Sequence, residues 1–380
     1  MIFSDVGDEN GDSLGFALAI SGDGMYMAAG AGEYAKLYTR SGMDWNMIQR
    51  INYARSLDLS HDGSTLAVGS GSVYIYDLNN VTGVYDLFHT TDDVRAHEVS
   101  LSGDGMVVGV TSGSYSGARI YERIGNVFQQ RGTDIFGYGF DSGIDLNYNG
   151  TVVIVGDHYW SSDDGNINGG SIGRAAVFQW RGENGEGSME WMQIGSNFTG
   201  DDLDTDLGCE GCLSITYDGL TVAVGASEYD RDYRVDRGLV RVYNHDSTSD
   251  TWVQIGSDLV GDDDFASFSR TALSSNGTYL AVGTSRSYGG RVKFFQRNGT
   301  NYETLVENIS GMNVDLSADG SVLVTSDYYF DIGSSTGKVY LYDTTKPPAP
   351  TTSSSQLSPS LPMFNAKSSF VCILMLWMFW

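Results

Sequence analysis

Apolar and polar residues alternate along this chain in short runs that are separated by glycine-containing turns. The stretch from Ser60 to Asp77 reads Ser-His-Asp-Gly, then Ser-Thr-Leu-Ala-Val-Gly, then Ser-Gly-Ser-Val-Tyr-Ile-Tyr-Asp. Alternation with a period of two is typical of half-buried β-strands. Asp-Gly and Asn-Gly favour tight hairpin turns because both residues tolerate positive φ angles. The stretch therefore predicts short antiparallel strands joined by a tight turn.

The same unit returns along most of the chain. Its turn glycine recurs seven times, at spacings of 39 to 69 residues, as Gly24, Gly63, Gly105, Gly150, Gly219, Gly277 and Gly320. Repeats of ~40 to 50 residues that carry only β signals indicate propeller blades. A fourth strand is visible in Trp191–Ser196 and again in Trp252–Ser257. The sequence therefore predicts an all-β fold, a seven-bladed β-propeller of four-stranded blades.

The two ends of the repeat region predict how the ring closes. The last unit stops after its third strand, at Lys338–Asp343, and residues 2–8 align with the fourth-strand segment at residues 255–261. We therefore expect the N-terminal strand to complete the last blade. The alternative is a frayed N-terminus, since termini without a partner are usually disordered.

The composition changes beyond residue 346, because all five prolines lie after it. We interpret residues 1–346 as the propeller, residues 347–369 as a disordered Ser/Thr/Pro-rich linker or stalk, and residues 370–380 as a hydrophobic tail. The tail is shorter than the ~20 residues of a membrane-spanning helix. Small residues at 353–355 followed by a spacer and this tail fit a GPI-anchor signal. The alternatives are a truncated span and an unprocessed tail, and the start at Met1 shows no secretory signal.

Charge and composition narrow the class of partner. The chain has 22 basic and 48 acidic residues, a net charge of -26, which disfavours nucleic acid because phosphate binding depends on Lys and Arg. Six Asn-x-Ser/Thr sequons favour a secreted, glycosylated surface. They begin at Asn80, Asn149, Asn197, Asn276, Asn298 and Asn308.

Three cysteines in 380 residues exclude a disulfide framework. Cys209 and Cys212 form a lone Cys-x-x-Cys pair, which we place on the first strand of the fifth blade. It lacks the second pair of a zinc ribbon. A local disulfide and two packed thiols both remain open.

Two sets of acidic residues are candidate cation ligands. In an up-and-down blade, the connections between second and third strands and between fourth and first strands share one face, where the acidic loops fall. Calcium takes six to eight oxygen ligands, and two of these loops offer several carboxylates each. They are Asp201, Asp202, Asp204 and Asp206 in one loop, and Asp163 and Asp164 in the other. The alternative is a solvated acidic face.

A second acidic set lies on the strands that line the channel. Aligned positions on the first strands read Ala19, Asp58, Ser100, Asp145, Ser214, Ala272 and Asp315. If Asp58, Asp145 and Asp315 point inward, their pKa values rise or they recruit a cation or water. The interpretation we prefer is that they accept hydrogen bonds from the backbone.

Exposed aromatic residues in the long loops are the candidate contacts for a partner, since Tyr and Trp dominate binding hot spots. They are Tyr159, Trp160, Tyr229, Tyr233, Tyr328 and Tyr329. The alternative is that these side chains pack the loops down. No catalytic constellation is visible: the five histidines show no ligand spacing, and the Gly-x-Ser-x-Gly match at residues 333–337 has no helix after it, as a nucleophile elbow requires.

The repeats resemble two propeller families. The residues 14–24, Leu-Gly-Phe-Ala-Leu-Ala-Ile-Ser-Gly-Asp-Gly, together with residues 222–227 and 238–243, look like the FG-GAP repeats of the integrin α-subunit head. The intact Asp-x-Asp-x-Asp-Gly calcium pattern of those blades is absent, so no family ligand transfers. The Ser-x-Asp-Gly turns with Tyr76-Asp77 and Tyr342-Asp343 also resemble WD40 repeats, although the Gly-His dipeptide is missing.

Together these patterns predict a non-catalytic, monomeric propeller at the cell surface or secreted, which binds a protein or glycan as an adhesion module. Membrane contact is expected through the C-terminal tail alone, and calcium is the one candidate cofactor. The alternatives are an intracellular WD40-like scaffold and a propeller hydrolase or lyase, because a fold does not fix a function.

Overall fold

The structure is a computed structural model, and the residues it describes cover most of the predicted propeller. They are residues 1–92, 94–112, 117–135, 143–161, 171–182, 189–201, 205–229, 236–262, 266–284, 290–331 and 335–345. The predicted linker and hydrophobic tail at residues 347–380 lie outside the described residues. Within the described part of the chain, no helix is long and apolar enough to cross a membrane.

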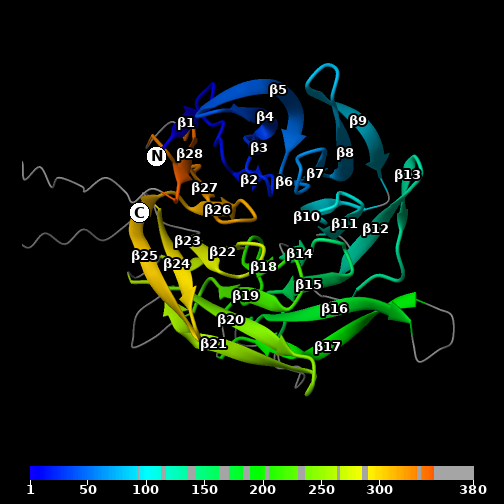
Figure 1. The fold of residues 1–380 in the computed structure, drawn as a ribbon, viewed down its shortest axis with the longest axis vertical. Coiled ribbons are helices and arrows are strands. Elements are labelled where there is room, and N and C mark those ends of the chain that lie inside the picture. The colour runs from blue at the N-terminus through cyan, green and yellow to red at the C-terminus, as the bar shows by residue number, and fades with distance from the viewer. Residues whose placement is uncertain are drawn as a thin grey trace, which may run out of the picture. The chain divides into compact units, whose positions relative to one another are not determined.

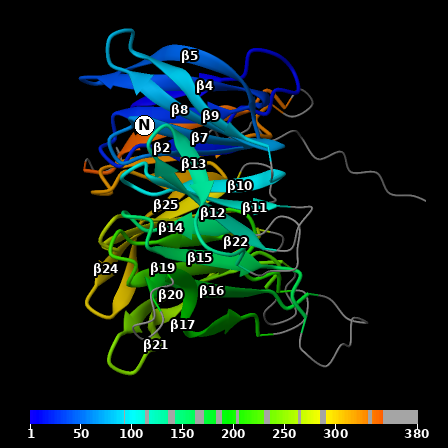
Figure 2. The ribbon, with the colours of Figure 1, turned by 90° about the vertical axis from the view of Figure 1, so that its right-hand side faces the viewer.

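The described residues form seven four-stranded antiparallel sheets arranged in a ring (Figure 1). The prediction of a seven-bladed all-β propeller is therefore confirmed. In each blade the first strand lies at the centre of the ring and the fourth lies at the outside. Figure 2 shows the blades from the side, with the strands running between the two faces of the ring.

The first six blades each take four consecutive strands. Blade 1 comprises β2 (Ala17–Ile20), β3 (Tyr26–Gly30), β4 (Gly32–Ser41) and β5 (Asp44–Ala54). Blade 2 comprises β6 (Ser56–Leu59), β7 (Thr65–Ser70), β8 (Ser72–Asn79) and β9 (Val84–Thr91). Blade 3 comprises β10 (Ala96–Leu101), β11 (Val107–Ser112), β12 (Ala118–Ile124) and β13 (Val127–Gln130). Blade 4 comprises β14 (Ile144–Leu146), β15 (Val152–Asp157), β16 (Arg174–Gly182) and β17 (Met189–Thr199). Blade 5 comprises β18 (Leu213–Ile215), β19 (Thr221–Ala226), β20 (Leu239–Asp246) and β21 (Thr251–Val260). Blade 6 comprises β22 (Phe268–Leu273), β23 (Tyr279–Thr284), β24 (Arg291–Asn298) and β25 (Asn301–Ser310).

The seventh blade is completed by the N-terminus, as the sequence predicts. It contains β26 (Asn313–Leu316), β27 (Val322–Asp327), β28 (Lys338–Asp343) and β1 (Phe3–Val6). Strand β1 pairs antiparallel with β28, from Phe3 opposite Leu341 to Val6 opposite Lys338. Figure 1 shows β1 beside β28 on the outside of the ring. The two ends of the repeat region therefore join.

The Ser-x-Asp-Gly signature is explained by the first turn of each blade. In the second blade, Ser60 Oγ accepts from the N–H of Thr65 at 3.0 Å, and Asp62 Oδ1 accepts from the N–H of Ser64 at 2.9 Å. The glycine adopts a positive φ, 67° at Gly63. Equivalent turns in the other six blades make the same two kinds of bond. Local side-chain hydrogen bonds of this kind specify a turn without help from distant residues.

The seven turns are linked to one another in a closed circle of backbone hydrogen bonds. Each turn donates one N–H to a carbonyl oxygen of the next blade's turn, and the donor–acceptor pairs are Asp23–His61, His61–Gly103, Asp104–Tyr148, Tyr148–Tyr217, Tyr217–Ser275, Ser275–Ala318 and Ala318–Gly22. Apolar side chains fill the spaces between neighbouring blades. For example, Met27 and Ala29 of blade 1 pack with Val324 and Leu341 of blade 7. The apolar core is therefore distributed between blades.

Candidate functional site: the central channel

The first strands of the seven blades surround a cavity of about 220 Å³ on the axis of the ring. Residues from all seven of these strands line it. Because alternate residues of a strand point to one side, each first strand contributes a small number of inward side chains. The cavity is therefore built from a few equivalent positions, repeated around the ring.

The three predicted channel aspartates accept hydrogen bonds from the neighbouring blade. Asp58 Oδ2 accepts from the N–H of Leu101 at 2.6 Å, and Asp145 Oδ2 accepts from Ile215 at 2.8 Å. Asp315 Oδ2 accepts from the N–H of Ile20 at 2.7 Å. Two serines at aligned positions do the same: Ser100 accepts from Leu146 and Ser214 accepts from Leu273. Five of the seven aligned positions therefore tie one blade to the next.

Burial raises the pKa of each of these carboxyl groups. The pKa of Asp58 rises to about 7. The pKa of Asp145 rises to about 8, because the Asp58 charge adds to the effect of burial. The pKa of Asp315 rises to about 7, and hydrogen bonds from Ile20 and Leu316 oppose the rise. These groups consequently change charge near neutral pH, inside the channel.

Three aromatic rings gather at the end of the channel formed by the Asp-Gly turns. His61 Nδ1 lies 2.9 Å from the hydroxyl oxygen of Tyr217, although the two residues belong to blades 2 and 5. The Tyr148 ring packs against both, with centroids 5.9 Å from His61 and 5.0 Å from Tyr217. Glycines make room for them, because a Cβ at Gly22 would lie 2.2 Å from His61 Nδ1. These side chains span the ring at this end.

Charged side chains lie at the opposite end, where the first strands begin. We call this end the channel mouth and define it by Arg55, Glu98, Glu210, Gly211 and Arg270, all of which line the cavity.

Two β-bulges lie beside the opposite charges of the mouth. Strand β10 shifts register between Ala96 and Glu98, and β22 shifts between Phe268 and Arg270. A bulge inserts an extra residue and re-aims the side chains beside it. Both shifts lie at the mouth ends of first strands, next to Glu98 and Arg270, which line the cavity.

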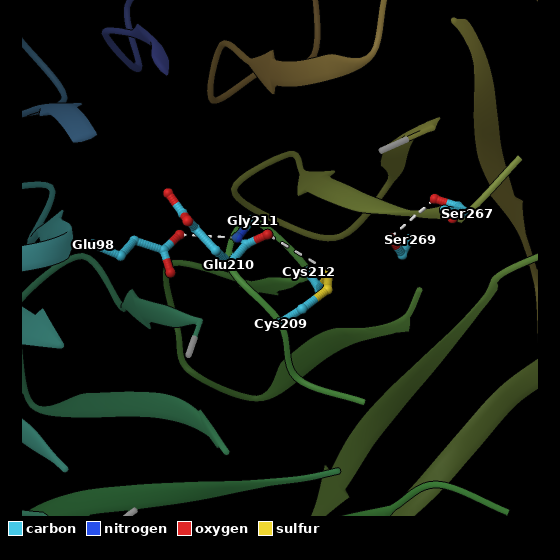
Figure 3. Close-up of a disulfide and its surroundings, with 7 residues drawn as sticks. All are labelled: Glu98, Cys209, Glu210, Gly211, Cys212, Ser267 and Ser269. Atoms are coloured by element: carbon cyan, nitrogen blue, oxygen red, sulfur yellow. Dashed lines mark hydrogen bonds between the residues drawn. A yellow bond between two sulfur atoms is a disulfide. The ribbon is translucent and has the colours of Figure 1, made fainter. Parts of the chain in front are cut away.

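A disulfide fixes the loop between these two charges. Cys209 and Cys212 are bonded, with Cα atoms 5.2 Å apart. The pair precedes β18, so our placement of both cysteines on that strand is corrected. The local-disulfide interpretation is confirmed. Figure 3 shows the Glu98 carboxylate pointing toward Gly211, and Glu98 Oε1 accepts from the Gly211 N–H at 3.0 Å.

The electrostatics of Glu98 reflect its neighbours. Burial raises the pKa of Glu98 well above its usual value, and the charge of Glu210 adds to the rise. The Gly211 N–H and the Arg270 guanidinium oppose it. Glu98 Oε2 is buried without a hydrogen-bond partner among the described residues. The mouth therefore holds a carboxyl group with unused hydrogen-bonding capacity.

The six aromatic residues predicted as partner contacts differ in how exposed they are. Tyr159 and Tyr329 are exposed, but Tyr328 is only 7% exposed, because its ring packs against Phe16 and Tyr329 with centroids 5.7 and 4.5 Å apart. Tyr328 is therefore not an exposed contact, which corrects the first expectation for this residue and agrees with the alternative that the ring packs its loop down. Trp160 is half-buried and lies beside the Arg174 guanidinium.

Of the remaining two predicted contact residues, the structure describes one. Tyr229 is partly buried against the apolar core between blades 4 and 5. Tyr233 lies outside the described residues.

The predicted calcium ligands are described in part. Asp163, Asp164, Asp202 and Asp204 lie outside the described residues. Asp201 forms an ion pair with Arg241, and Asp206 accepts a hydrogen bond from Ser171. Within the described ranges, no group of three or more His, Cys, Asp or Glu side chains could hold a metal. Calcium binding stays a prediction.

Several residues of the channel escaped the sequence analysis although a signal for them exists. Glu98 and Arg270 stand two positions before Ser100 and Ala272 on the same strands, so alternation places them on the channel side. His61, Tyr148 and Tyr217 all occupy the variable position of the Ser-x-Asp-Gly turn. What the sequence does not show is that these turns meet across the ring.

Comparisons with known proteins support the fold. No protein-family model matches the sequence, and no curated protein matches it. Among solved structures, a chain of the "Crystal Structure of Mitotic Checkpoint Complex" is 15% identical with a TM-score of 0.59, covering 90% of this chain and 94% of its own.

Two further structures show the same likeness. "Kuenenia stuttgartiensis Hydrazine Synthase" is 14% identical with a TM-score of 0.57, covering 89% of this chain and 96% of its own. The Cps50 (Swd1) β-propeller domain of Myceliophteria thermophila is 11% identical with a TM-score of 0.56, covering 89% and 99%. At these identities the likeness supports the fold alone, and together with the seven four-stranded sheets it defines the class of protein as a seven-bladed propeller.

Proposed function

We propose that this propeller is a protein-interaction module that binds its partner on the face that carries the channel mouth. This face holds the connections between second and third strands and between fourth and first strands, and we call it the long-loop face. The opposite face holds the Asp-Gly turns, and we call it the turn face. The proposal follows the scaffold interpretation of the sequence.

The observation that carries the proposal is an exposed aromatic pair beside the mouth. Phe16 and Tyr329 are each 38% exposed, and both contact the buried Tyr328 ring. Phe16 also lines the central cavity. Large rings that rest on a buried partner lose little conformational freedom when they bind, and aromatic residues are enriched in hot spots. The likeness to a chain of a multi-protein complex supports the same class of function.

The finer parts of our interpretation remain proposals. All six sequon asparagines are exposed, which supports glycosylation and hence display outside the cell. Glycan binding, a lipid anchor and a monomeric state are proposed on the sequence alone. The FG-GAP relationship rests on the residues quoted above.

A matched pair of variants tests the proposal. The first carries Phe16→Ser and Tyr329→Ser on the long-loop face. The control carries Met25→Ser and Met106→Ser, which are 38% and 42% exposed on the turn face. Each immobilised protein is used to capture partners from an extract of the source organism, with quantification by mass spectrometry. We expect a protein captured by the wild type and the control to be depleted at least tenfold by the first variant. Equal capture by all three, or loss in the control alone, contradicts the proposal.

A further inference from the structure

Glu98 and Arg270 approach the same residue from two sides without forming an ion pair. The Gly211 N–H donates to Glu98 Oε1 at 3.0 Å. A Cβ at Gly211 would lie 2.5 Å from a terminal nitrogen of Arg270. The Arg270 charge also acts on Glu98. Yet none of the ion pairs between described residues joins the two side chains.

Both side chains retain unused hydrogen-bonding groups. Glu98 Oε2 and Arg270 Nε are buried and have no hydrogen-bond partner among the described residues. A buried polar atom without a hydrogen-bond partner is unfavourable, and more so when its group is charged. The two atoms belong to side chains of opposite charge that line the same cavity. A ligand that carries both a hydrogen-bond donor and an acceptor satisfies both atoms.

We propose that the channel mouth binds a small zwitterion, a molecule with a cationic amine and a carboxylate such as a free α-amino acid, held between Glu98 and Arg270. The amine is the donor that Glu98 Oε2 lacks. The carboxylate is the acceptor that a guanidinium binds best, because its N–H groups match the two oxygens. This inference is independent of protein binding on the long-loop face.

The size of the cavity fits this class of ligand. Its volume of about 220 Å³ lies below the roughly 300–1,000 Å³ of sites for drug-sized molecules. It exceeds the ~30 Å³ share of one water molecule several times over. A molecule of the size of an amino acid therefore fits this cavity.

The loop between the two charges is preorganised. Gly211 has a φ of 70°, which favours glycine, and a side chain there would collide with Arg270. The Cys209–Cys212 disulfide holds the loop from both ends (Figure 3). Glu210 extends beside Glu98 in the same view and adds a second carboxylate on the amine side. A fixed site avoids the ordering cost that weakens binding.

The test uses the full chain and three kinds of probe. Each common free amino acid is added at millimolar concentration, and binding is measured by thermal shift and titration calorimetry. Propylamine provides the amine without the carboxylate, and propionate provides the carboxylate without the amine. We expect at least one amino acid to raise the melting temperature by a few degrees, and neither single-charge probe to match it.

Variants then locate the bound molecule. Glu98→Gln and Arg270→Gln should each weaken binding at least tenfold, whereas Glu307→Gln, an exposed residue of the outer strand β25, should leave it unchanged. Circular dichroism and melting without ligand show whether each variant is folded. If one variant does not fold, the other variant and the comparison of probes on the wild type still test the proposal. The proposal is overturned if no amino acid binds the wild type, if a single-charge probe binds as tightly, or if a folded variant retains full affinity.

Discussion

The Nζ atom of Lys36 lies 3.2 Å from Oδ2 of Asp5, and this ion pair ties the third strand of blade 1 to the strand that completes blade 7. The same Nζ lies 2.7 Å from Asp8 and donates to the Val6 carbonyl at 2.9 Å. The Tyr38 hydroxyl donates to Asp5 at 2.6 Å. Lys36 is only 5% exposed. The N-terminal segment is thus held by blade 1 as well as by β28.

Replacing Lys36 tests how much this closure contributes. Breaking a fully buried ion pair costs about 3–5 kcal/mol, but Asp5 and Asp8 keep some contact with water. We therefore expect Lys36→Met to lower the free energy of unfolding by about 2 kcal/mol, measured by urea denaturation. The control is Lys293→Met, whose partner Asp262 is mostly exposed. That surface pair should contribute less than about 1 kcal/mol. Equal losses in both variants would argue against a special role for the closure.

Two turn glycines separate backbone strain from side-chain collision. Gly63 and Gly42 have φ angles of 67° and 65°, so alanine is strained at both. A Cβ at Gly63 would lie 2.2 Å from the Tyr26 ring, whereas no atom lies within 4 Å at Gly42. We expect Gly42→Ala to cost about 1 kcal/mol and Gly63→Ala to cost roughly 1–3 kcal/mol more. Urea denaturation of both variants measures the difference, and similar costs would show that blades 1 and 2 pack loosely at this turn.

The channel carboxyls predict an unusual dependence of stability on pH. The folded protein holds protons on Asp58, Asp145 and Asp315 up to pH values of about 7 to 8. The unfolded chain, with aspartate pKa values near 3.9, releases them earlier. The contribution of these groups is therefore fully present below about pH 4 and is lost as the pH rises to about 8.

An asparagine at position 145 should reduce this dependence. We expect Asp145→Asn to flatten the fall in unfolding free energy between about pH 5 and pH 8 by up to about 1.4 kcal/mol per pH unit. Asp62 is the matched control, because hydrogen bonds in its turn lower its pKa despite an opposing effect of burial. Asp62→Asn should leave the slope unchanged in this range. Parallel slopes for wild type and Asp145→Asn would contradict the raised pKa.

The disulfide predicts a stability response to reductant. A cross-link that closes a loop of four residues stabilises a protein by about 2 kcal/mol in the chain-entropy model. We expect a dithiol reductant, or the double change Cys209→Ser and Cys212→Ser, to lower the unfolding free energy by that amount. The double variant itself should not respond to reductant. A response of equal size in the double variant would trace the effect to another group.

The sequence predicts this fold because each blade contains a local turn signal that does not depend on the other blades. Ser60, Asp62 and Gly63 specify a turn through bonds within six residues, and six further copies repeat the signal. The closure of the ring was predictable because residues 2–8 resemble a fourth strand and the last blade lacks one.

The candidate site was predictable only in part, since it depends on contacts between distant blades. The alignment placed Asp58 in the channel, but its hydrogen bond to Leu101 depends on how two blades dock. Alternation places Glu98 and Arg270 on the channel side, but their approach to Gly211 from two sides depends on how blades 3, 5 and 6 dock. Tyr328 is buried because Phe16, more than 300 residues earlier, packs on it.

Hydrogen exchange of the protein with and without its captured partner tests the central claim most directly. If the partner binds the long-loop face, amides near Phe16 and Tyr329 should exchange more slowly in the complex, while those near Met25 and Met106 stay unchanged. Slower exchange confined to the Met25 and Met106 turns would place the partner on the turn face and contradict the account.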